Sequence, residues 1–448
     1  MLTIVSQALC FITLNIFILV LISILCQNIG IIVIGIVGVM ITTICARGLN
    51  KNTYAYMTIL MLVMFLFLFF HYNMLIEKYG IPYYAGDDEQ FEVWGHALYK
   101  KGYFLHADLE NFVFTNQGNA RGYPLLLARI ELLAGGTYHT LMPRILNLYL
   151  WLSTSLLTLK IFRLKMRNSK IEKFILFSLA LFPNGIYISS FVYRDTALEF
   201  LIIVAIYNAF LIFNISHINY EHNLFSKMFI LISLFYIYYM RKMMIPVCVL
   251  MGIVIYLDAH KVDYKNRKIL SYIIVGSILF IGIAVSDIGI QIWHYSTKYQ
   301  QYILSQKYGF SSSIFRMPIL PYGWIVRILY GMTSPFPGTL LSLNFVDYPL
   351  YSTMEAIISI GTIFQIFLLP YVFRGIANKN CYALLYIVMM LVICLTTFTF
   401  RHFIMPLPFL ALTAAEMYIN TKNTIHQKYF IEIGMLLIIL CVIYILMR

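Results

Sequence analysis

The chain has 448 residues, of which 61% are hydrophobic and only 11% are charged, and its formal net charge is +13. Its continuous apolar runs approach the roughly 20 residues that a helix needs to cross a bilayer. This composition predicts a polytopic α-helical membrane protein and excludes a transmembrane β-barrel, whose strands alternate in polarity. The positive charge does not indicate a nucleic-acid partner, because Lys and Arg collect in short connecting segments, as in the cytoplasmic loops of membrane proteins.

About thirteen apolar segments are predicted to span the membrane, and they form a single integral domain, 1–448, with an all-α fold. The predicted spans are 7–26, 29–46, 54–76, 142–162, 174–193, 196–213, 228–240, 243–257, 269–286, 355–373, 381–398, 403–419 and 429–447. Several of these are shorter than about 20 residues, so they must begin earlier or cross a thinned region of the bilayer.

The basic residues between the spans predict the orientation. Those predicted to face the cytoplasm are Arg47, Lys51, Arg163, Lys165, Arg167, Lys170, Lys173, Lys261, Lys265, Arg267, Lys268, Arg374, Lys379, Lys422 and Lys428. If successive spans cross the membrane in alternating directions, all of these basic residues lie on the cytoplasmic side, provided that two further apolar stretches do not cross the membrane. The stretch 122–134 is short and charged, which predicts a helix on the outer surface. The stretch 323–346 is broken by Pro335 and Pro337, which predicts a re-entrant or surface element.

This orientation places two long segments, 77–141 and 287–354, on the non-cytoplasmic side, and loops of this length in compact proteins are usually functional. The first contains four carboxylates within six positions, namely Asp87, Asp88, Glu89 and Glu92. An ionised side chain in lipid costs several kcal/mol. The acidic cluster is therefore either a solvated loop or a working site at the membrane face.

Cationic side chains are also predicted on the outer side, against the charge bias of the cytoplasmic loops. They are Arg194 (next to Asp195), Arg241, Lys242, Arg316, Arg401 and His402. Such residues can bind anionic lipid head groups, or they can line a pocket opposite the carboxylates. Arginine suits phosphate through its bidentate geometry, and a carboxylate suits a hydroxyl acceptor as a base or a positioning group.

Several short motifs follow one another between positions 83 and 208. They are Gly86-Asp87-Asp88-Glu89, Ala97, Gly102-Tyr103, Gly122-Tyr123-Pro124-Leu125, Gly135-Gly136, Arg144 through Asn147, and Pro183-Asn184-Gly185-Ile186-Tyr187-Ile188-Ser189-Ser190, followed by Arg194-Asp195. In their order, spacing and placement on one membrane side, they resemble the GT-C superfamily of polyprenyl-phosphate-sugar-dependent glycosyltransferases. The similarity is to bacterial relatives of protein mannosyltransferases and of lipid A aminoarabinose transferase. The chain departs from many of these relatives in having two apolar segments before the helix that enters the acidic loop.

The resemblance implies a GT-C-like fold and a multi-pass enzyme of the bacterial cytoplasmic membrane with its active site on the extracytoplasmic side. It would move a sugar from a polyprenyl-phosphate carrier to a glycan, lipid or protein acceptor, with inversion and without a nucleotide, metal or other cofactor. The expected partners are the lipid-linked donor, the acceptor and membrane lipids, and no nucleic acid.

The resemblance also assigns the catalytic carboxylate, and the other site residues are expected from their charge, their type and their predicted outer position. An acidic pair in the first large outer loop supplies the catalytic carboxylate in this family, which points to Asp87 or Asp88, with Asp195 orienting the acceptor or the base. Arg194, Arg241, Arg401 and His402 are the expected donor-phosphate ligands. Glu89, Glu92, Tyr84 and Trp94 are the expected substrate contacts.

Two other functions fit parts of the sequence. A repeat-unit polymerase for O-antigen or capsule also joins lipid-linked sugars on the outer face and carries outer arginines, but it needs no acidic pair after a membrane helix. A transporter of lipid-linked sugars should carry charges deep in several helices, often in paired halves. Here Glu199 is the main intramembrane acid, and no second half matches it.

Overall fold

A computed structural model of the chain describes residues 2–50, 52–84, 86–112, 121–214, 220–260, 322–335, 345–396 and 399–447, with isolated positions between 290 and 343. Every regular element within these ranges is a helix, which confirms the all-α class. The predicted span 269–286, the basic residues from Lys261 to Lys268, Lys51 and part of the segment 287–354 lie outside the described residues.

Seven helical segments of the described chain are long and apolar enough to cross a membrane. They are Ser6–Leu25, Asn52–Tyr79, Leu141–Lys165, Arg194–Phe213, Leu224–Ala259, Pro349–Ala377 and Phe400–Ile419. Helices of this length and composition indicate a protein embedded in a membrane. The number of about thirteen spans stays a prediction. The segments 228–240 and 243–257, predicted as separate spans, belong to one helical run, because a short 3-10 turn replaces the loop expected at Arg241-Lys242.

The predicted span 174–193 is broken in the structure. Helix α7 (Ser169–Ala180) and helix α8 (Pro183–Ser189) meet at an angle of 45°. Pro183 lacks a backbone N–H and restricts the conformation of Phe182, which is extended, so the helix cannot run through this point. The break places the short α8 and the residues after it beside the candidate site described below.

The helices form two compact units. The first comprises Met1–Asn208, Lys227–Lys242 and Asn344–Met354, and the second comprises Ala209–Ser226, Met243–Leu343 and Glu355–Arg448. The helices of the first unit, besides α7 and α8, are α1 (Leu2–Leu25), α2 (Gly30–Ala46), α3 (Asn52–Tyr79), α4 (Gly86–Lys100), η1 (His106–Asn111), α5 (Gly122–Leu133), α6 (Leu141–Lys165), and most of α9 (Arg194–Asn214) and α10 (Tyr220–Arg241).

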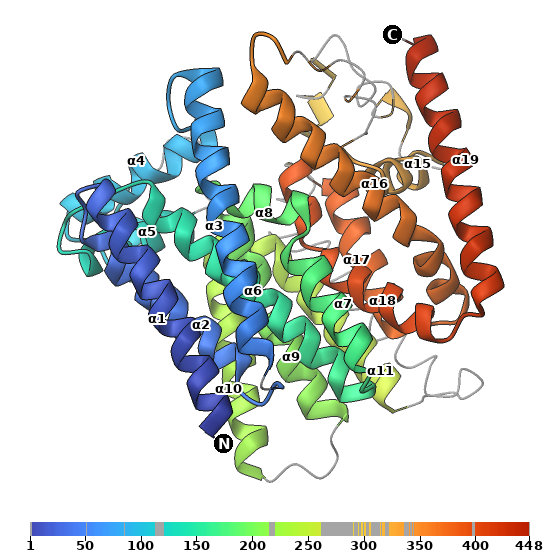
Figure 1. The fold of residues 1–448 in the computed structure, drawn as a ribbon, viewed down its shortest axis with the longest axis horizontal. Helices are drawn as coiled ribbons and strands as arrows, with labels where there is room; N and C mark the ends of the chain where they lie inside the picture. The colour runs from blue at the N-terminus through green and yellow to red at the C-terminus, as the bar shows by residue number, and fades with distance from the viewer. Residues whose placement is uncertain are drawn as a thin grey trace. The chain divides into compact units, whose positions relative to one another are not determined.

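Helix α6 is the centre of the first unit, with α2, α3, α7 and α8 packed around it (Figure 1). Its contact with α2 is close because Gly38 faces Tyr149, and a Cβ at position 38 would lie only 2.2 Å from the tyrosine side chain. Polar side chains cross the same contact, where the hydroxyls of Thr42 and Ser153 lie 3.0 Å apart. This packing makes α6 a rigid support for the groups at its N-terminal end.

Helices α4 and α5 pack against each other beside the N-terminal end of α6 (Figure 1). Three carboxylates of the acidic cluster, which was expected in a loop, lie in the first turn of α4, where they complement the positive end of the helix dipole, and Glu92 lies one turn further along. Helix α5 occupies the stretch 122–134 and has only 12 residues, too few to cross a bilayer. Its first residue, Gly122, packs on the backbone of Tyr239 and Met240 at distances that exclude a side chain.

The second unit is built around α17 (Cys381–Thr396). Its other elements are η2 (Lys242–Met244, joining the units), α11 (Ile245–Ala259), α15 (Trp324–Met332), most of α16 (Pro349–Ala377), η5 (Phe400–Ile404), α18 (Leu407–Ile419) and α19 (Asn423–Met447). Helices α11, α15 and α18 all pack on α17. Helix α15 has nine residues and lies in the stretch 323–346, for which a re-entrant or surface element is predicted.

Candidate functional site

The four carboxylates of α4 have different surroundings because they lie on different faces of one helix. Asp88 and Glu92 are four residues apart, share a face and are both buried. Asp87 is partly exposed and Glu89 is exposed. The acidic cluster is therefore divided into a buried pair and an accessible pair.

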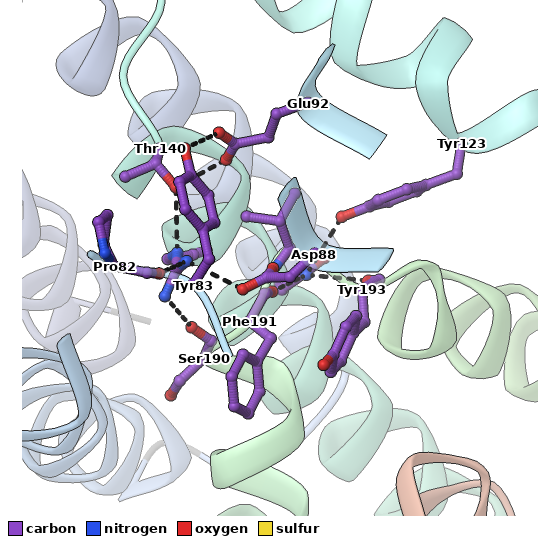
Figure 2. Close-up of polar contacts among 12 residues, drawn as sticks. Pro82, Tyr83, Asp88, Glu92, Tyr123, Thr140, Ser190, Phe191 and Tyr193 are labelled. Carbon is purple, nitrogen blue, oxygen red and sulfur yellow. Dashed lines mark hydrogen bonds and ion pairs between the residues drawn. The ribbon is translucent and has the colours of Figure 1, made fainter. Parts of the chain in front are cut away.

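Asp88 is fully buried and held on both carboxylate oxygens. Its Oδ1 accepts a hydrogen bond from the backbone N–H of Val192 at 2.7 Å, and its Oδ2 lies 3.3 Å from Nη2 of Arg144 (Figure 2). The backbone N–H of Tyr84 also donates to this carboxylate. Asp88 thus joins α4 to the segment before it and to the connection between α8 and α9.

Arg144 is the fully buried partner of Asp88, and its guanidinium donates to three further oxygens. Nη2 donates to the carbonyl of Pro82, Nη1 to the carbonyl of Ser190 at 3.2 Å, and Nε to the hydroxyl of Thr140 at 3.3 Å (Figure 2). Burying a guanidinium is costly unless its donors are paired, and here they are. One side chain of α6 therefore fixes the α3–α4 connection, α4 and the end of α8.

Glu92 forms a second buried junction one turn along α4. Its carboxylate accepts hydrogen bonds from the hydroxyls of Tyr83 and Thr140, each at 2.6 Å (Figure 2). On α6, Asn147 donates to the carbonyls of Phe191 at 2.9 Å and Tyr193 at 3.2 Å. The polar face of α6 therefore holds α4 on one side and the α8–α9 connection on the other.

Burial raises the pKa of Asp88 from its ordinary value of 3.8 to about 6, although the nearby guanidinium of Arg144 and the N–H of Val192 act in the opposite direction. In the unfolded chain the pKa returns to about 4. The folded protein therefore binds this proton more tightly, so the contribution of Asp88 to stability is complete below about pH 4 and is lost as pH rises through about 6.

This linkage gives a measurable pH dependence. The variant Asp88→Asn cannot titrate at this position, so its stability should lack the corresponding loss. We expect the wild type to lose stability relative to Asp88→Asn between about pH 4 and pH 6, and the difference to be constant above about pH 7. Melting temperatures in detergent across this range measure the effect, and a difference that does not vary with pH contradicts the assignment.

A second charged cluster lies at the start of α9. Asp195 is fully buried in the first turn of this helix, and its Oδ1 lies 3.7 Å from Nη1 of Arg241, the last residue of α10. Arg194 donates to the carbonyl of Met240 at 3.3 Å, and its guanidinium lies 6.0 Å from the ring centroid of Phe91 on α4. The buried network of Asp88 and Arg144 and this second cluster are therefore connected through α4 and through the residues just before α9.

Comparisons of the chain with protein-family models, with curated proteins and with solved structures each found no match. Its function must therefore be inferred from the chemistry of its own residues. The first unit offers an accessible carboxylate at Asp87, a rigid buried network beneath it, and two arginines at the neighbouring helix ends. This combination can bind an anion and accept a proton from a substrate hydroxyl.

The structure brings most of the predicted site residues together in the first unit. Asp87, Asp88, Glu89, Glu92, Tyr84 and Trp94 lie on α4 or just before it, and Arg194, Asp195 and Arg241 lie at the ends of α9 and α10. Trp94 is buried and packs against Phe91, whose ring centroid is 6.2 Å away, so its indole belongs to the core of this unit. Tyr84 and Glu89 are exposed and can reach a substrate.

Arg401 and His402 belong to the second unit. Both lie in the 3-10 turn η5, and His402 is buried with its Nδ1 2.6 Å from the hydroxyl of Thr399. Their assignment to the donor phosphate stays a prediction.

Sequence reasoning did not assign a role to Arg144, Thr140 or Asn147. A signal was present, because Arg144 and Asn147 begin the strongly apolar stretch 142–162, where polar residues need partners. The spacing of these three residues places them on one face of a helix. The identity of their partners depends on contacts far apart in the sequence.

Proposed function

We propose that this protein is an integral membrane glycosyltransferase that moves a sugar from a polyprenyl-phosphate carrier to a hydroxyl group of a glycan, lipid or protein acceptor. The observation that carries the proposal is the division of the acidic cluster. Asp87 is partly exposed in the first turn of α4, a few residues after the membrane-type helix α3, while its neighbour Asp88 is held by Arg144 and the Val192 N–H. We place this site on the extracytoplasmic face of the bacterial cytoplasmic membrane, in line with the positive-inside pattern.

Asp87 is the better candidate for the base that accepts the proton of the acceptor hydroxyl. A general base must reach its substrate, and a fully buried carboxylate that already accepts several hydrogen bonds does not meet this condition. Asp88 instead positions the first turn of α4, and Asp87 is its direct neighbour in that turn. The predicted acidic pair thus divides into a base and a positioning residue.

The departing group of this reaction is a lipid phosphate, which leaves readily and needs no general acid. It does need positive charge nearby in the transition state. Arg194 and Arg241 are buried at the ends of α9 and α10, so they supply this charge as fixed groups of the first unit rather than as exposed side chains. Asp195 orients Arg241 through their ion pair. The phosphate then leaves with the bonding electrons while Asp87 takes the hydroxyl proton. The attack occurs from the face opposite the leaving group, so the anomeric configuration inverts.

The test is to incubate purified protein in phospholipid nanodiscs with each class of donor and to identify the products by mass spectrometry. The proposal expects one sugar residue to be added to the acceptor from a polyprenyl-phosphate sugar, and none from a nucleotide sugar. Extension by whole repeat units from a pyrophosphate-linked oligosaccharide would instead support a polymerase. Movement of the lipid across the membrane without a covalent change would support a transporter.

A further inference from the structure

Tyrosine side chains gather just beyond the membrane-type part of α3. Tyr79 is 38% exposed and Tyr84 is 46% exposed, and their ring centroids lie 5.6 Å apart. The ring of Tyr351, from the first turn of α16, lies 6.5 Å from that of Tyr79. Both ring pairs are nearly perpendicular, with interplanar angles of 80° and 88°. We call Tyr79, Tyr84 and Tyr351 the aromatic platform.

Specific contacts fix Tyr351 beside the end of α3. The carboxylate of Glu77 accepts hydrogen bonds from the backbone N–H groups of Leu350 at 3.0 Å and Tyr351 at 3.1 Å. A carboxylate is favourable at this position because the first N–H groups of a helix have no partner within the helix. The ammonium of Lys78 lies 3.3 Å from the ring centroid of Tyr348, a close cation–π contact. Consecutive residues of α3 therefore hold a segment that is distant in the sequence.

The aromatic platform is also tied to the buried network. The N–H of Tyr84 donates to the Asp88 carboxylate, and the Tyr84 ring lies 6.0 Å from the ring of Phe191. Phe191 precedes Val192, whose N–H donates to the same carboxylate. Asp88 thus anchors the backbone on both sides of this aromatic contact. Tyr84 comes only three positions before Asp87, so the platform adjoins the proposed base.

We propose that the aromatic platform binds a pyranose ring of the substrate, an assignment that rests on the proposed function. A pyranose has a face of C–H groups that packs on an aromatic ring, and a rim of hydroxyls that needs polar partners. The exposed carboxylate of Glu89 and the ammonium of Lys78 supply such partners close to the rings in sequence. Interfacial tyrosines that only contact lipid head groups need no such fixed arrangement. Here the rings come from separate segments, and the Glu77 carboxylate caps the helix that carries Tyr351.

The test measures sugar binding separately from sugar transfer. Purified protein in phospholipid nanodiscs, which avoid the pyranose head groups of maltoside detergents, is mixed with methyl glucoside, methyl mannoside and methyl N-acetylglucosaminide. Saturation-transfer NMR then detects contact with the ring C–H protons. We expect binding of at least one pyranoside, weakened roughly tenfold by Tyr84→Ala and by Tyr79→Ala, and retained in the Phe variants of both positions.

The matched control is Tyr238→Ala, because Tyr238 lies on α10 and is 49% exposed but lies outside the platform. This control should bind as the wild type does. The absence of binding to every pyranoside, or an equal loss in Tyr238→Ala, overturns the proposal.

Kinetics then identify the source of the sugar and separate this proposal from the previous one. A higher KM for the acceptor in Tyr84→Ala assigns the platform to the acceptor, and a higher KM for the donor assigns it to the transferred sugar. If pyranoside binding depends on the tyrosines but no sugar is transferred, the aromatic platform is supported and the transferase proposal is rejected. Transfer with unchanged KM values and unchanged pyranoside binding in the tyrosine variants rejects the platform alone.

Discussion

Replacing Arg144 with methionine is expected to lower the free energy of unfolding by about 3–5 kcal/mol, which is typical for removing one member of a buried ion pair. The substitution leaves Asp88 buried without its ion-pair partner. It also removes the donors that satisfy the carbonyls of Pro82 and Ser190, and buried acceptors without a donor are costly. Loss of this one side chain should therefore release α4 and the α8–α9 connection together.

A matched control exists on the same helix. Arg163, near the C-terminal end of α6, pairs with Glu172 at 3.2 Å, but its side chain is 19% exposed. Because water reaches this pair more easily than the Asp88–Arg144 pair, Arg163→Met should cost clearly less than Arg144→Met. Unfolding of both variants in mixed micelles gives the comparison. Equal losses of stability would show that Arg144 has no special structural role.

The change Asp88→Asn should be milder than Arg144→Met. An asparagine keeps an acceptor oxygen for the N–H of Val192, and the guanidinium of Arg144 keeps its contacts with the carbonyls of Pro82 and Ser190. Since burial already disfavours the ionised form of Asp88, the loss of its charge costs little. A greater loss of stability from Asp88→Asn than from Arg144→Met would contradict this account of the network.

The second large effect concerns activity. We expect Asp87→Asn to reduce the rate of sugar transfer by about 10²–10⁴-fold, the usual contribution of a general base. Asp87 is partly exposed, so the amide should leave the melting temperature close to that of the wild type. Initial rates measured with a polyprenyl-phosphate sugar, together with melting curves of the same samples, test both expectations.

The control for Asp87→Asn is Glu110→Gln, which removes a carboxylate from the same outer segment. Glu110 is exposed in η1 and belongs to neither cluster, so this variant should keep full activity. Asp88→Asn should retain more activity than Asp87→Asn because the buried carboxylate only positions the turn. Full activity in Asp87→Asn with none in a well-folded Asp88→Asn would reverse the two roles.

The sequence predicted the all-α fold class because it depends on local patterns, and the same kind of pattern indicated the acidic cluster as a candidate site. Apolar runs of membrane length identify helices such as α3 and α6, whose bounds extend the predicted spans 54–76 and 142–162 by only a few residues at either end. Carboxylates directly after such an apolar run are candidate site residues, because ionised side chains are unfavourable in lipid. The break within 174–193 could have been expected from Pro183 alone.

The roles within the site could not be predicted, because they depend on helical phase and on distant partners. Asp87 and Asp88 are adjacent, and only the orientation of α4 buries one and leaves the other accessible. The partner of Asp88 lies 56 residues away, and the contact between Glu77 and Tyr351 joins residues 274 positions apart. Neither pairing has a signal in a single sequence. Trp94 was predicted as a substrate contact from its type, and its place in the core follows from the packing of α4 on α5.

The most direct test of the central claim is the anomeric configuration of the product. A single displacement assisted by Asp87 attacks the sugar from the face opposite the lipid phosphate, so the new linkage must have the configuration opposite to that of the donor. NMR coupling constants of the purified product, made from a polyprenyl-phosphate sugar of known configuration, give the answer in one measurement. An inverted linkage carrying one added sugar is the predicted result, and a retained configuration would contradict the account.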